Sequence, residues 1–468
     1  MTEWRDVIIV GAGITGLVTA YQLRQQGLNI SLLERDKNVG GVMRSEQRNG
    51  FLLERGPNSF LASAEAVNLI NELGLDTEFV TAPPKLPRYI FYRGALQPLP
   101  MNPLAFLFSP LLSLKGKLRI FAEPFIPAPH SNKDDSIADF FRRRLGSETH
   151  DRLVAPFVSG IYAGNTEKLS IAASFPKLAE MEAEYGSLLW GAIRSTKSAA
   201  SKNEQKPGVK KHLSSFRDGL ATLPCTLARH LDDALLMACV IVGITINPHS
   251  PRYQVQYQQL DQSYTLSTDT LVLVTPAMET ARLLNDSLPS LAAELQAIEY
   301  APVVLVYLSF NKQELDQRLN GFGFLAPRNE GLRLLGSVWN SSIFPGRAPQ
   351  GKTLLTNFIG GAHDPEAMQL SEEKLIEIVT RELQMALRTS APAEAIDVYK
   401  IPRAIPQYTI GHIDRVARIN RLLAEQPGLH LAGNYLRGVS VPDCISRAVE
   451  LAAELAISTQ SARLQPIG

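Results

Sequence analysis

The clearest hydrophobic pattern lies at the start of the chain. Residues Val7–Val10 form an uninterrupted β-branched run, which is typical of a strand buried on both faces. Apolar residues then recur at helical spacing from Ile14 to Leu23, and Gly27 marks the end of this helix. Residues 30–33 are a second apolar run. The pattern therefore predicts a strand, a helix and a second strand in a βαβ unit.

Two other patterns follow later in the chain. Strand-like runs at 240–242 and 270–275, with a hairpin between them and a helix after them, suit the far half of a doubly wound sheet. Residues 300–405 carry further strand-like runs and then a helix from Ser371 to about Leu387, which favours an antiparallel sheet backed by helices. These runs are 303–310, 322–326, 332–339 and 353–359.

The middle of the chain has an unusual apolar segment. Residues 94–114 contain no charge, but prolines interrupt them, so no straight membrane-spanning helix forms there. Lys115, Lys117 and Arg119 follow at once. Apolar side chains beside cations predict a surface that enters one membrane leaflet, and a buried inter-domain segment is the alternative. Residues 195–211 are small, polar and basic and predict a surface loop.

Composition narrows the classes of protein that remain. The chain has 468 residues, 45% hydrophobic and 20% charged, with a net charge of +1. This describes a globular protein with an ample core and gives no sign of nucleic-acid binding. The scattered cysteines match no metal spacing and no disulfide framework. The first strand begins at residue 7, so we expect no cleavable targeting peptide.

The chemistry of the first βαβ unit is specific. Gly11 allows the tight turn, Gly13 lets a pyrophosphate approach the backbone, and Gly16 lets the helix pack on the strand. The helix N-terminus favours phosphate charge. Glu34, at the end of the second strand, is placed to accept hydrogen bonds from a ribose. The pattern therefore predicts a dinucleotide site. The pair Gly40-Gly41 resembles the extended fingerprint of FAD oxidases of the amine-oxidase type.

An ordered set of motifs extends this resemblance along the chain. The motifs are GFLLERGPNSF (50–60), LPRYIFYRG (86–94), PFVSGIYAG (156–164), GFGFLAP (321–327), FPGRAP (344–349), FIGG (358–361), AIPQYTIGH (404–412) and the stretch 431–443. With them, the chain resembles the oxygen-dependent protoporphyrinogen IX oxidases of plants and bacteria. The resemblance covers nearly its whole length.

The resemblance implies an α/β fold (α+β overall) with three parts. A Rossmann-like FAD-binding domain of the amine-oxidase and p-hydroxybenzoate-hydroxylase type would comprise residues 1–84, 212–290 and 406–468. A substrate domain of antiparallel sheet and helices would comprise 85–93 and 291–405. An α-helical membrane-binding domain would comprise 94–211.

The fingerprint and the resemblance together assign a set of residues to FAD. They are Gly11, Ala12, Gly13, Ile14, Thr15, Gly16, Glu34, Arg35, Gly40, Gly41, Val42, Arg44, Gly56, Pro57, Asn58, Val240, Val242, Gly433, Asn434, Val439 and Val441.

The resemblance also implies a substrate site. Arg88 matches an arginine that pairs with a propionate, a task for which guanidinium is suited. Phe358 matches an aromatic residue that packs on a pyrrole. Leu325 and Val338 match two aliphatic residues that hold the macrocycle, although Val338 is smaller than the usual Leu. Local sequence alone assigns Arg88 to a solvated surface and the three apolar residues to the core.

The expected reaction is the six-electron oxidation of protoporphyrinogen IX by FAD, with oxygen as acceptor and hydrogen peroxide as by-product, in tetrapyrrole biosynthesis. No residue is assigned as catalytic, and the proton acceptor stays open. Oxidation of coproporphyrinogen III, and an amine or carotenoid oxidoreductase of the same fold, are the alternatives. The non-enzyme alternative is a prenyl-protein escort module, against which the intact glycine turn argues, since a carrier does not need that turn.

The resemblance further implies where the protein works. We expect a monotopic protein on the cytoplasmic face of a membrane, a homodimer, and hand-over of the product to a chelatase.

Overall fold

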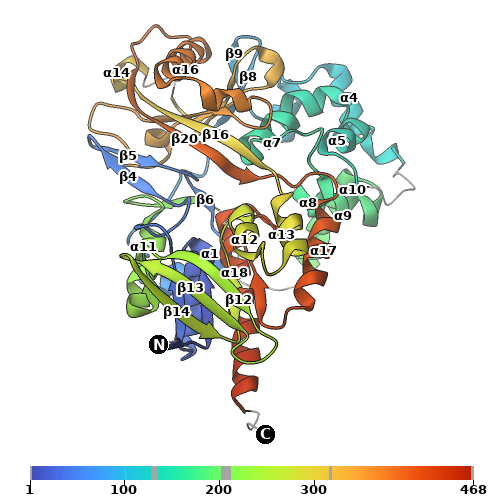
Figure 1. Cartoon of the computed structure of the whole chain (residues 1–468). Helices are drawn as coiled ribbons and strands as arrows, with labels where there is room; N and C mark the ends of the chain where they lie inside the picture. Colours follow the sequence, from blue (N-terminus) through green and yellow to red (C-terminus); the bar gives the residue numbers. More distant parts are fainter. Residues whose placement is uncertain (1–2, 101, 128–133, 202–211, 316–318, 465–468) are drawn as a thin grey trace.

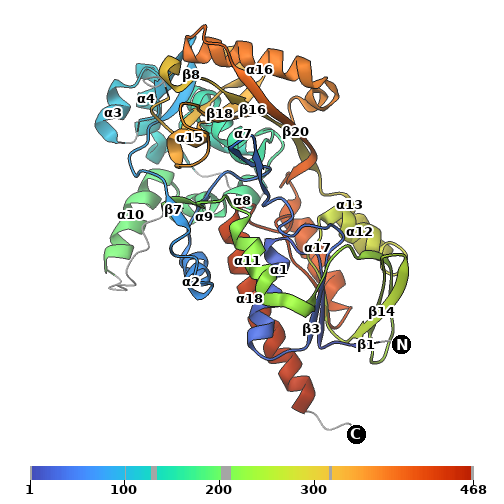
Figure 2. The same cartoon turned by 90° about the vertical axis from the view of Figure 1, so that its left-hand side faces the viewer.

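The computed structural model describes residues 3–100, 102–127, 134–201, 212–315 and 319–464. The chain folds into three units, and the lower and upper units are each built from separate stretches of the chain (Figures 1 and 2). Both ends of the chain build the lower unit of Figure 1, a large mixed sheet forms the upper unit, and helices from the middle of the chain pack beside them.

A parallel sheet is the centre of the lower unit. Its strand order is β11-β3-β2-β15-β21, and Val7 pairs with Ile30 while Leu271 pairs with both Ile8 and Leu429. The predicted strands at Val7–Val10 and Ile30–Leu33 are confirmed. The strands are β2 (Val7–Val10), β3 (Ile30–Leu33), β11 (Leu235–Leu236), β15 (Leu271–Leu273) and β21 (Leu429–Leu431).

Two different layers cover this sheet. On one face α1 packs against α18 and α11, and on the other lies the sheet β1-β14-β13-β12 with α12, α13 and α17. Burial of the sheet on both faces explains its uninterrupted apolar strands. The elements are α1 (Ile14–Gln25), α2 (Ala64–Glu72), α11 (Thr222–Leu231), α12 (Ala277–Leu284), α13 (Pro289–Gln296), α17 (His412–Ala424), α18 (Val441–Leu464), β1 (Glu3–Trp4), β12 (Val240–Ile246), β13 (Tyr253–Gln259) and β14 (Gln262–Thr268).

Two small sheets connect the lower unit to the upper one. They are β4 (Ser45–Arg48) with β5 (Phe51–Glu54), and β6 (Phe60–Leu61) with β10 (Leu213–Phe216) and β7 (Phe79–Thr81). Arg48 and Arg55 of the first hairpin form ion pairs with Asp397 of the upper sheet. The hairpin therefore fixes the two units relative to each other.

The upper unit is a seven-stranded sheet of order β20-β16-β19-β18-β17-β8-β9. The expected antiparallel sheet is confirmed except at one position, because β17 runs parallel to β8. Pairing of β9 with β8 extends this sheet past residue 93, to Pro98. The strands are β8 (Arg88–Tyr92), β9 (Ala95–Pro98), β16 (Tyr300–Ser309), β17 (Gly323–Leu325), β18 (Leu334–Val338), β19 (Leu355–Gly360) and β20 (Glu394–Pro406).

Strand β20 has no counterpart among the predicted elements. Its sequence mixes charged and apolar residues without regular alternation, and two irregularities interrupt its register with β16. One face of the sheet packs on α16 (Glu372–Leu387), which confirms the helix expected from Ser371. Short helices α14 (Lys312–Leu315), α15 (Asn340–Ile343), η4 (Arg328–Glu330) and η5 (Pro365–Gln369) lie in its connections.

Helices make up the third unit. They are α3 (Pro103–Phe108), α4 (Leu114–Phe121), η1 (Glu123–Phe125), α5 (Ile137–Leu145), α6 (Ser147–Thr149), η2 (His150–Val154), α7 (Ala155–Tyr162), α8 (Ile171–Ser174), α9 (Pro176–Tyr185) and α10 (Leu188–Ser201). The loop expected at 195–211 is wrong up to Ser201, where α10 continues, and residues 202–211 lie outside the described residues. Among the helices of the described ranges, none combines the length and apolarity that crossing a bilayer requires.

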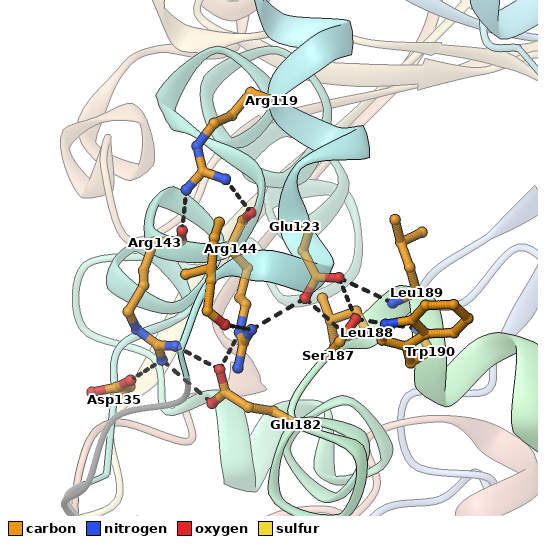
Figure 3. A network of polar contacts seen from close by, with 11 residues as sticks. Arg119, Glu123, Asp135, Arg143, Arg144, Glu182, Ser187, Leu188, Leu189 and Trp190 are labelled. Carbon is orange, nitrogen blue, oxygen red and sulfur yellow. Dashed lines mark hydrogen bonds and ion pairs between the residues drawn. The ribbon is translucent and has the colours of Figure 1, made fainter.

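A buried ionic network ties these helices together (Figure 3). Arg144 of α5 and Glu123 of η1 are both fully buried, and their side chains lie 3.4 Å apart. Arg144 also pairs with Glu182 of α9. Glu123 accepts hydrogen bonds from the hydroxyl of Ser187 (2.6 Å) and from the backbone N–H of Leu188 (2.9 Å), and so caps α10. One charged cluster therefore holds four helical segments.

Candidate functional site

The glycine turn at the end of β2 has the expected geometry. Gly11 has a φ of +108°, which favours glycine. A Cβ on Gly16 would lie 2.0 Å from the carbonyl oxygen of Gly11, so close packing of helix on strand requires glycine there. A Cβ on Gly13 would meet nothing within 4 Å. This open space lies at the N-terminus of α1, beside residues Ile14 and Thr15, where backbone N–H groups attract phosphate.

Glu34 lies at the neighbouring strand end. Its carboxylate accepts hydrogen bonds from the backbone N–H of Ala12 (2.7 Å) and of Asp36 (2.8 Å). These bonds fix the carboxylate beside the glycine turn, where a ribose would lie. The adjoining Arg35 is largely exposed and reaches the carboxylates of Asp36 and Glu279.

Strand β12 comes close to the same edge. The N–H of Cys239 donates to the carbonyl oxygen of Glu34 at 2.8 Å, which places the start of β12 next to the second strand. Val240 is 45% exposed and Val242 is 52% exposed. The structure therefore brings both predicted valines near Glu34, as apolar side chains without a protein layer over them.

The second glycine pair returns the chain to the first turn. Gly40 donates its N–H to the carbonyl oxygen of Ala12 at 2.8 Å, and a Cβ on Gly41 would lie 3.4 Å from the Cα of Gly13. Val42 is 53% exposed, and a Cβ on Gly56 would lie 2.1 Å from its carbonyl oxygen. Segments around residues 13, 41 and 56 thus meet at one place.

Two further predicted residues in this region have protein partners. Arg44 pairs with the carboxylate of Asp36. Asn58, which follows Gly56 and Pro57, accepts a hydrogen bond of 2.6 Å from the side-chain amide of Asn340. Since Asn340 follows β18, Asn58 marks the contact between the nucleotide unit and the upper sheet.

The C-terminal segment completes the nucleotide edge. The N–H of Ala432 donates to Leu273 of the neighbouring strand at 3.2 Å, and Gly433 and Asn434 follow directly. The carbonyl oxygen of Asn434 accepts a hydrogen bond from the hydroxyl of Tyr408. Val441 packs in the core with α1, whereas Val439 packs against the helical unit. The end of β21 and the start of α18 therefore lie at the junction of the units.

The four predicted substrate residues lie on one face of the upper sheet. In the first row, Gly323 of β17 pairs with Arg88 of β8 and with Val338 of β18. Paired residues, and residues two apart on a strand, point to the same face of a sheet. Arg88 is exposed, and its guanidinium carbon lies 5.3 Å from the ring centre of Phe322.

The second row continues this face. Leu325 pairs with Gly336 of β18, which pairs in turn with Phe358 of β19. A Cβ on Gly160 of α7 would lie 2.6 Å from Cδ2 of Leu325, so α7 crosses this face directly. Leu325, Val338 and Phe358 are half-buried rather than sealed in the core. Figure 2 shows α16 and α7 on opposite sides of the sheet, and the predicted residues share the side of α7.

Sequence reasoning missed a buried acid beside this site. Glu54 ends β5 and is only 1% exposed. It accepts hydrogen bonds from the hydroxyl of Ser45 (2.7 Å) and from the N–H of Leu220 (2.9 Å). Burial raises the pKa of the Glu54 carboxyl to about 7, although these bonds and nearby Arg347 oppose the shift. The only sequence feature that could have indicated this buried acid is its position at the end of the apolar run FLLE.

A cavity of about 800 Å³ lies in the upper unit. Leu86, Phe344, Arg347, Lys312 and Lys352 are among its lining residues. None of the predicted cofactor or substrate residues lines it. The described residues contain no group of three or more side chains suited to hold a metal ion.

Comparisons with known proteins agree with this architecture. The family model described as flavin containing amine oxidoreductase matches residues 14–456. A chloroplastic protoporphyrinogen oxidase of Nicotiana tabacum is 33% identical, over 96% of this chain and 85% of the relative. A coproporphyrinogen III oxidase of Bacillus subtilis is 29% identical, over 95% of this chain and 96% of the relative.

Solved structures show the same fold. A protein of Exiguobacterium sp. 255-15, assigned provisionally as a protoporphyrinogen oxidase, is similar with a TM-score of 0.79 and 26% identity, over 98% of this chain and 99% of the other. Cyclohexylamine oxidase of Brevibacterium oxydans gives a TM-score of 0.71 at 16% identity, over 97% of this chain and 99% of the other, and shows the fold alone.

The chain belongs to the flavin-containing amine oxidoreductase family. It is an FAD-dependent oxidoreductase, as the glycine motifs predicted. FAD fits the residues present, because the space above Gly13 is open and Val42, Val240 and Val242 are uncovered. When bound, FAD supplies a two-electron acceptor; the N-terminus of α1 would hold its pyrophosphate and Glu34 its ribose.

Proposed function

We propose that the protein catalyses the oxygen-dependent six-electron oxidation of protoporphyrinogen IX to protoporphyrin IX. The observation that supports this most directly is the register of the upper sheet, which puts Arg88, Val338, Leu325 and Phe358 on one face. This face combines one cation with an apolar strip, as a tetrapyrrole with carboxylate side chains requires. Relatives named for porphyrinogen oxidation match nearly the whole chain.

The protein's own residues bind and orient the substrate in this proposal. Arg88 pairs with a carboxylate, and the apolar side chains of Leu325, Val338 and Phe358 hold the macrocycle and exclude water. Each of three rounds removes two hydrogens from the porphyrinogen and reduces one molecule of oxygen to hydrogen peroxide. No described residue is assigned as the proton acceptor.

Replacement of Arg88 by alanine is expected to raise KM for protoporphyrinogen about 10- to 100-fold, because a charge-assisted pair contributes roughly 1.5–3 kcal/mol. The flavin content and kcat should change little, since Arg88 lies on the sheet and not at the glycine turn. Aerobic turnover followed by porphyrin fluorescence measures this.

Arg93→Ala is the matched control, because Arg93 is an exposed arginine on the turn of the same hairpin. We expect this variant to keep the wild-type KM for protoporphyrinogen. Wild-type kinetics in the Arg88 variant would remove this residue from the site. Absence of turnover by the yellow wild-type protein would reject the proposed reaction itself.

We further propose that the α3–α4 surface docks on one leaflet of a membrane. Leu104, Phe108, Leu114 and Phe125 are 66%, 81%, 74% and 88% exposed. The ring centres of Phe106 and Phe121 lie 6.5 Å apart and join the two helices. Lys115, Lys117 and Arg119 flank these apolar groups. Apolar side chains beside cations suit the boundary between acyl chains and anionic headgroups.

The double variant Phe108→Asp/Phe125→Asp is expected to lose most binding to anionic liposomes. Burial of one large apolar side chain contributes about 1.5–3 kcal/mol, so the partition coefficient should fall at least about 100-fold. Co-sedimentation measures this. Leu260→Asp is the control, because Leu260 is 88% exposed at the β13–β14 turn, at the opposite end of the molecule from α4 (Figures 1 and 2). Equal binding of all three proteins would contradict the proposal.

The homodimer, the cytoplasmic face of the membrane and the hand-over of product to a chelatase stay predictions from the family resemblance.

A further inference from the structure

The buried carboxylate of Glu54 connects two segments that border the second glycine pair. Glu54 ends β5 and is 1% exposed. Its Oε2 accepts a hydrogen bond from the hydroxyl of Ser45 at 2.7 Å, and its Oε1 accepts one from the backbone N–H of Leu220 at 2.9 Å. The carboxylate therefore joins the hairpin β4–β5 to the segment that leads into α11.

This junction is closely packed. The Ser45 oxygen also accepts a hydrogen bond from the N–H of Ala221 at 3.0 Å. A Cβ on Gly219 would lie 2.3 Å from Oγ of Ser45 and 2.9 Å from Oε1 of Glu54. Gly219 has a φ of +93°, so the contact and the backbone angle both favour glycine. Glu54 and Ser45 thus hold residues 219–221 in one defined position.

Helix α11 carries this position to the cofactor turn. Pro224 lies in the first turn of α11, and a Cβ on Gly40 would lie 3.0 Å from its Cγ. Gly40 donates its N–H to the carbonyl oxygen of Ala12, in the first glycine turn, at 2.8 Å. The placement of α11 therefore determines how closely the second glycine pair approaches the open space above Gly13.

The hairpin reaches the same turn along the chain. Ser45 begins β4, two residues after Met43. The N–H of Met43 donates to the carbonyl oxygen of Gly40 at 2.9 Å and closes the turn. The carboxylate of Glu54 thus holds this turn from both sides, through Ser45 on the hairpin and through α11 on the other side.

The hydrogen bonds to Glu54 depend on its charge. The Ser45 hydroxyl and the Leu220 N–H both donate, and an ionised carboxylate accepts from each. Protonation turns one carboxyl oxygen into a donor that faces a donor. Burial raises the pKa of the Glu54 carboxyl to about 7, although both hydrogen bonds and the charge of Arg347 oppose the shift. Glu54 therefore changes its charge near neutral pH.

The other titratable groups around Glu54 are Tyr307, Arg347 and Asp218. The Tyr307 hydroxyl donates to the backbone carbonyl oxygen of Glu54 at 2.7 Å, and burial raises the pKa of Tyr307 further above its ordinary value. Arg347 donates to the carbonyl oxygens of residues 216 and 217 and stays protonated, as arginines in proteins do. Asp218 acts on Arg347. Tyr307 and Arg347 therefore keep their protons in the range where Glu54 titrates.

We propose that Glu54 is a positioning residue for FAD, which holds the second glycine turn in its cofactor-binding geometry while its carboxylate is ionised. Glu54 acts through Gly40 and Met43, on which both of its connections converge. The enzyme therefore binds FAD more tightly above neutral pH than below it. The inference rests on the FAD site and is independent of the porphyrinogen proposed as substrate.

The stability of the fold should follow the opposite pH dependence. The pKa of Glu54 is raised from 4.5 to about 7 in the folded protein. Its contribution to the free energy of unfolding is therefore complete below the unfolded pKa and is lost as the pH rises through the folded pKa. A carboxylate with a structural role alone would make FAD affinity fall together with stability as the pH rises. The two roles thus predict opposite pH profiles for FAD.

The dissociation constant of FAD, obtained from the fluorescence of flavin released as the holoenzyme is diluted, tests this. For wild type it should be about tenfold larger at about pH 6 than at about pH 8. Glu54→Gln keeps the shape of the side chain without its charge. Its constant should be the same at both pH values and close to that of wild type at the lower one.

A second pair of variants tests the same connection at Ser45. Ser45→Ala should weaken FAD binding at the higher pH by about threefold to tenfold, because Glu54 loses a donor and Ala221 loses its acceptor. Ser45→Thr keeps the hydroxyl and should restore most of the affinity. Equal FAD binding by the alanine and threonine variants would contradict the role of this hydrogen bond.

Glu46→Gln is the matched control for Glu54→Gln. Glu46 is an exposed acid of the same hairpin, and its partner Arg55 keeps a second ion pair with Asp397. This variant should keep the wild-type pH profile. Equal FAD constants of wild type at the two pH values, or tighter binding at the lower one, would overturn the inference, as would a Glu54→Gln profile identical to wild type. Since no porphyrinogen enters the measurement, such a failure would leave the proposed function standing.

Discussion

Replacement of Gly13 by valine should yield a folded protein with little FAD and no oxidase activity. Gly13 has extended backbone geometry (φ −70°, ψ 174°), which valine adopts without strain. A Cβ at this position meets no protein atom within 4 Å, so the fold tolerates it. The added side chain instead occupies the space above the turn where the pyrophosphate would lie. Overpacking against a rigid turn costs about 3 kcal/mol, or roughly 100-fold in FAD affinity.

Flavin absorbance per mole of protein measures the expected loss of FAD, and urea unfolding measures whether the variant keeps its fold. Gly243→Val is the matched control, because a Cβ there meets only Gln256 Oε1 at 3.6 Å, and it should keep its flavin. Gly16→Ala should fail differently, since a Cβ 2.0 Å from the Gly11 carbonyl oxygen prevents folding. A yellow, fully active Gly13 variant would show that the cofactor does not approach this turn.

Replacement of Arg144 by methionine should destabilise the helical unit by about 3–5 kcal/mol. Arg144 and Glu123 are fully buried, and Glu182 is nearly so (Figure 3). Methionine keeps much of the volume but removes the cation that faces buried Glu123 and leaves Glu182 to its second partner, Arg143, and loss of such a buried counter-charge costs far more than loss of a surface pair. Arg144 also donates to the carbonyl oxygen of Ile126 at 2.8 Å, so that carbonyl loses its donor as well.

Arg142→Met on the same helix is the control for this experiment. Arg142 pairs with Glu167 at the surface, with 37% and 49% of the side chains exposed, and such pairs contribute about 0–1 kcal/mol. Thermal and urea unfolding should therefore separate the two variants clearly. If Arg144→Met/Glu123→Gln were as unstable as Arg144→Met alone, the uncompensated charge of Glu123 would not be the cause.

Local sequence correctly predicted the strand, helix and second strand around the glycine turn. The strand Val7–Val10, the helix from Ile14 and the carboxylate of Glu34 lie within one βαβ unit, where short-range sterics and helix-end electrostatics fix the geometry. Gly11 is required by its positive φ, and Gly16 is required by the close contact of the helix with the strand. The residue types alone therefore predict the conformation of this turn. The helix that begins after Ser371 was predicted equally well, because its N-cap and the helical spacing of its apolar residues both lie within one short stretch of sequence.

The substrate face could not be derived in the same way. Arg88, Val338 and Phe358 come from strands far apart in the chain, and each by itself looks like an ordinary surface or core residue. Only strand register decides that they share a face, and the parallel pairing of β17 with β8 was not foreseen.

The burial of charge was also decided by tertiary structure. Glu54 and Arg144 are charged residues in amphipathic or apolar segments, and their sequence neighbours do not show that water is excluded from them. The sequence by itself therefore determined the cofactor turn, because that turn is made by adjacent residues. The three-dimensional packing decided the substrate face and the charged networks, because both depend on which distant segments meet and on how much water remains between them.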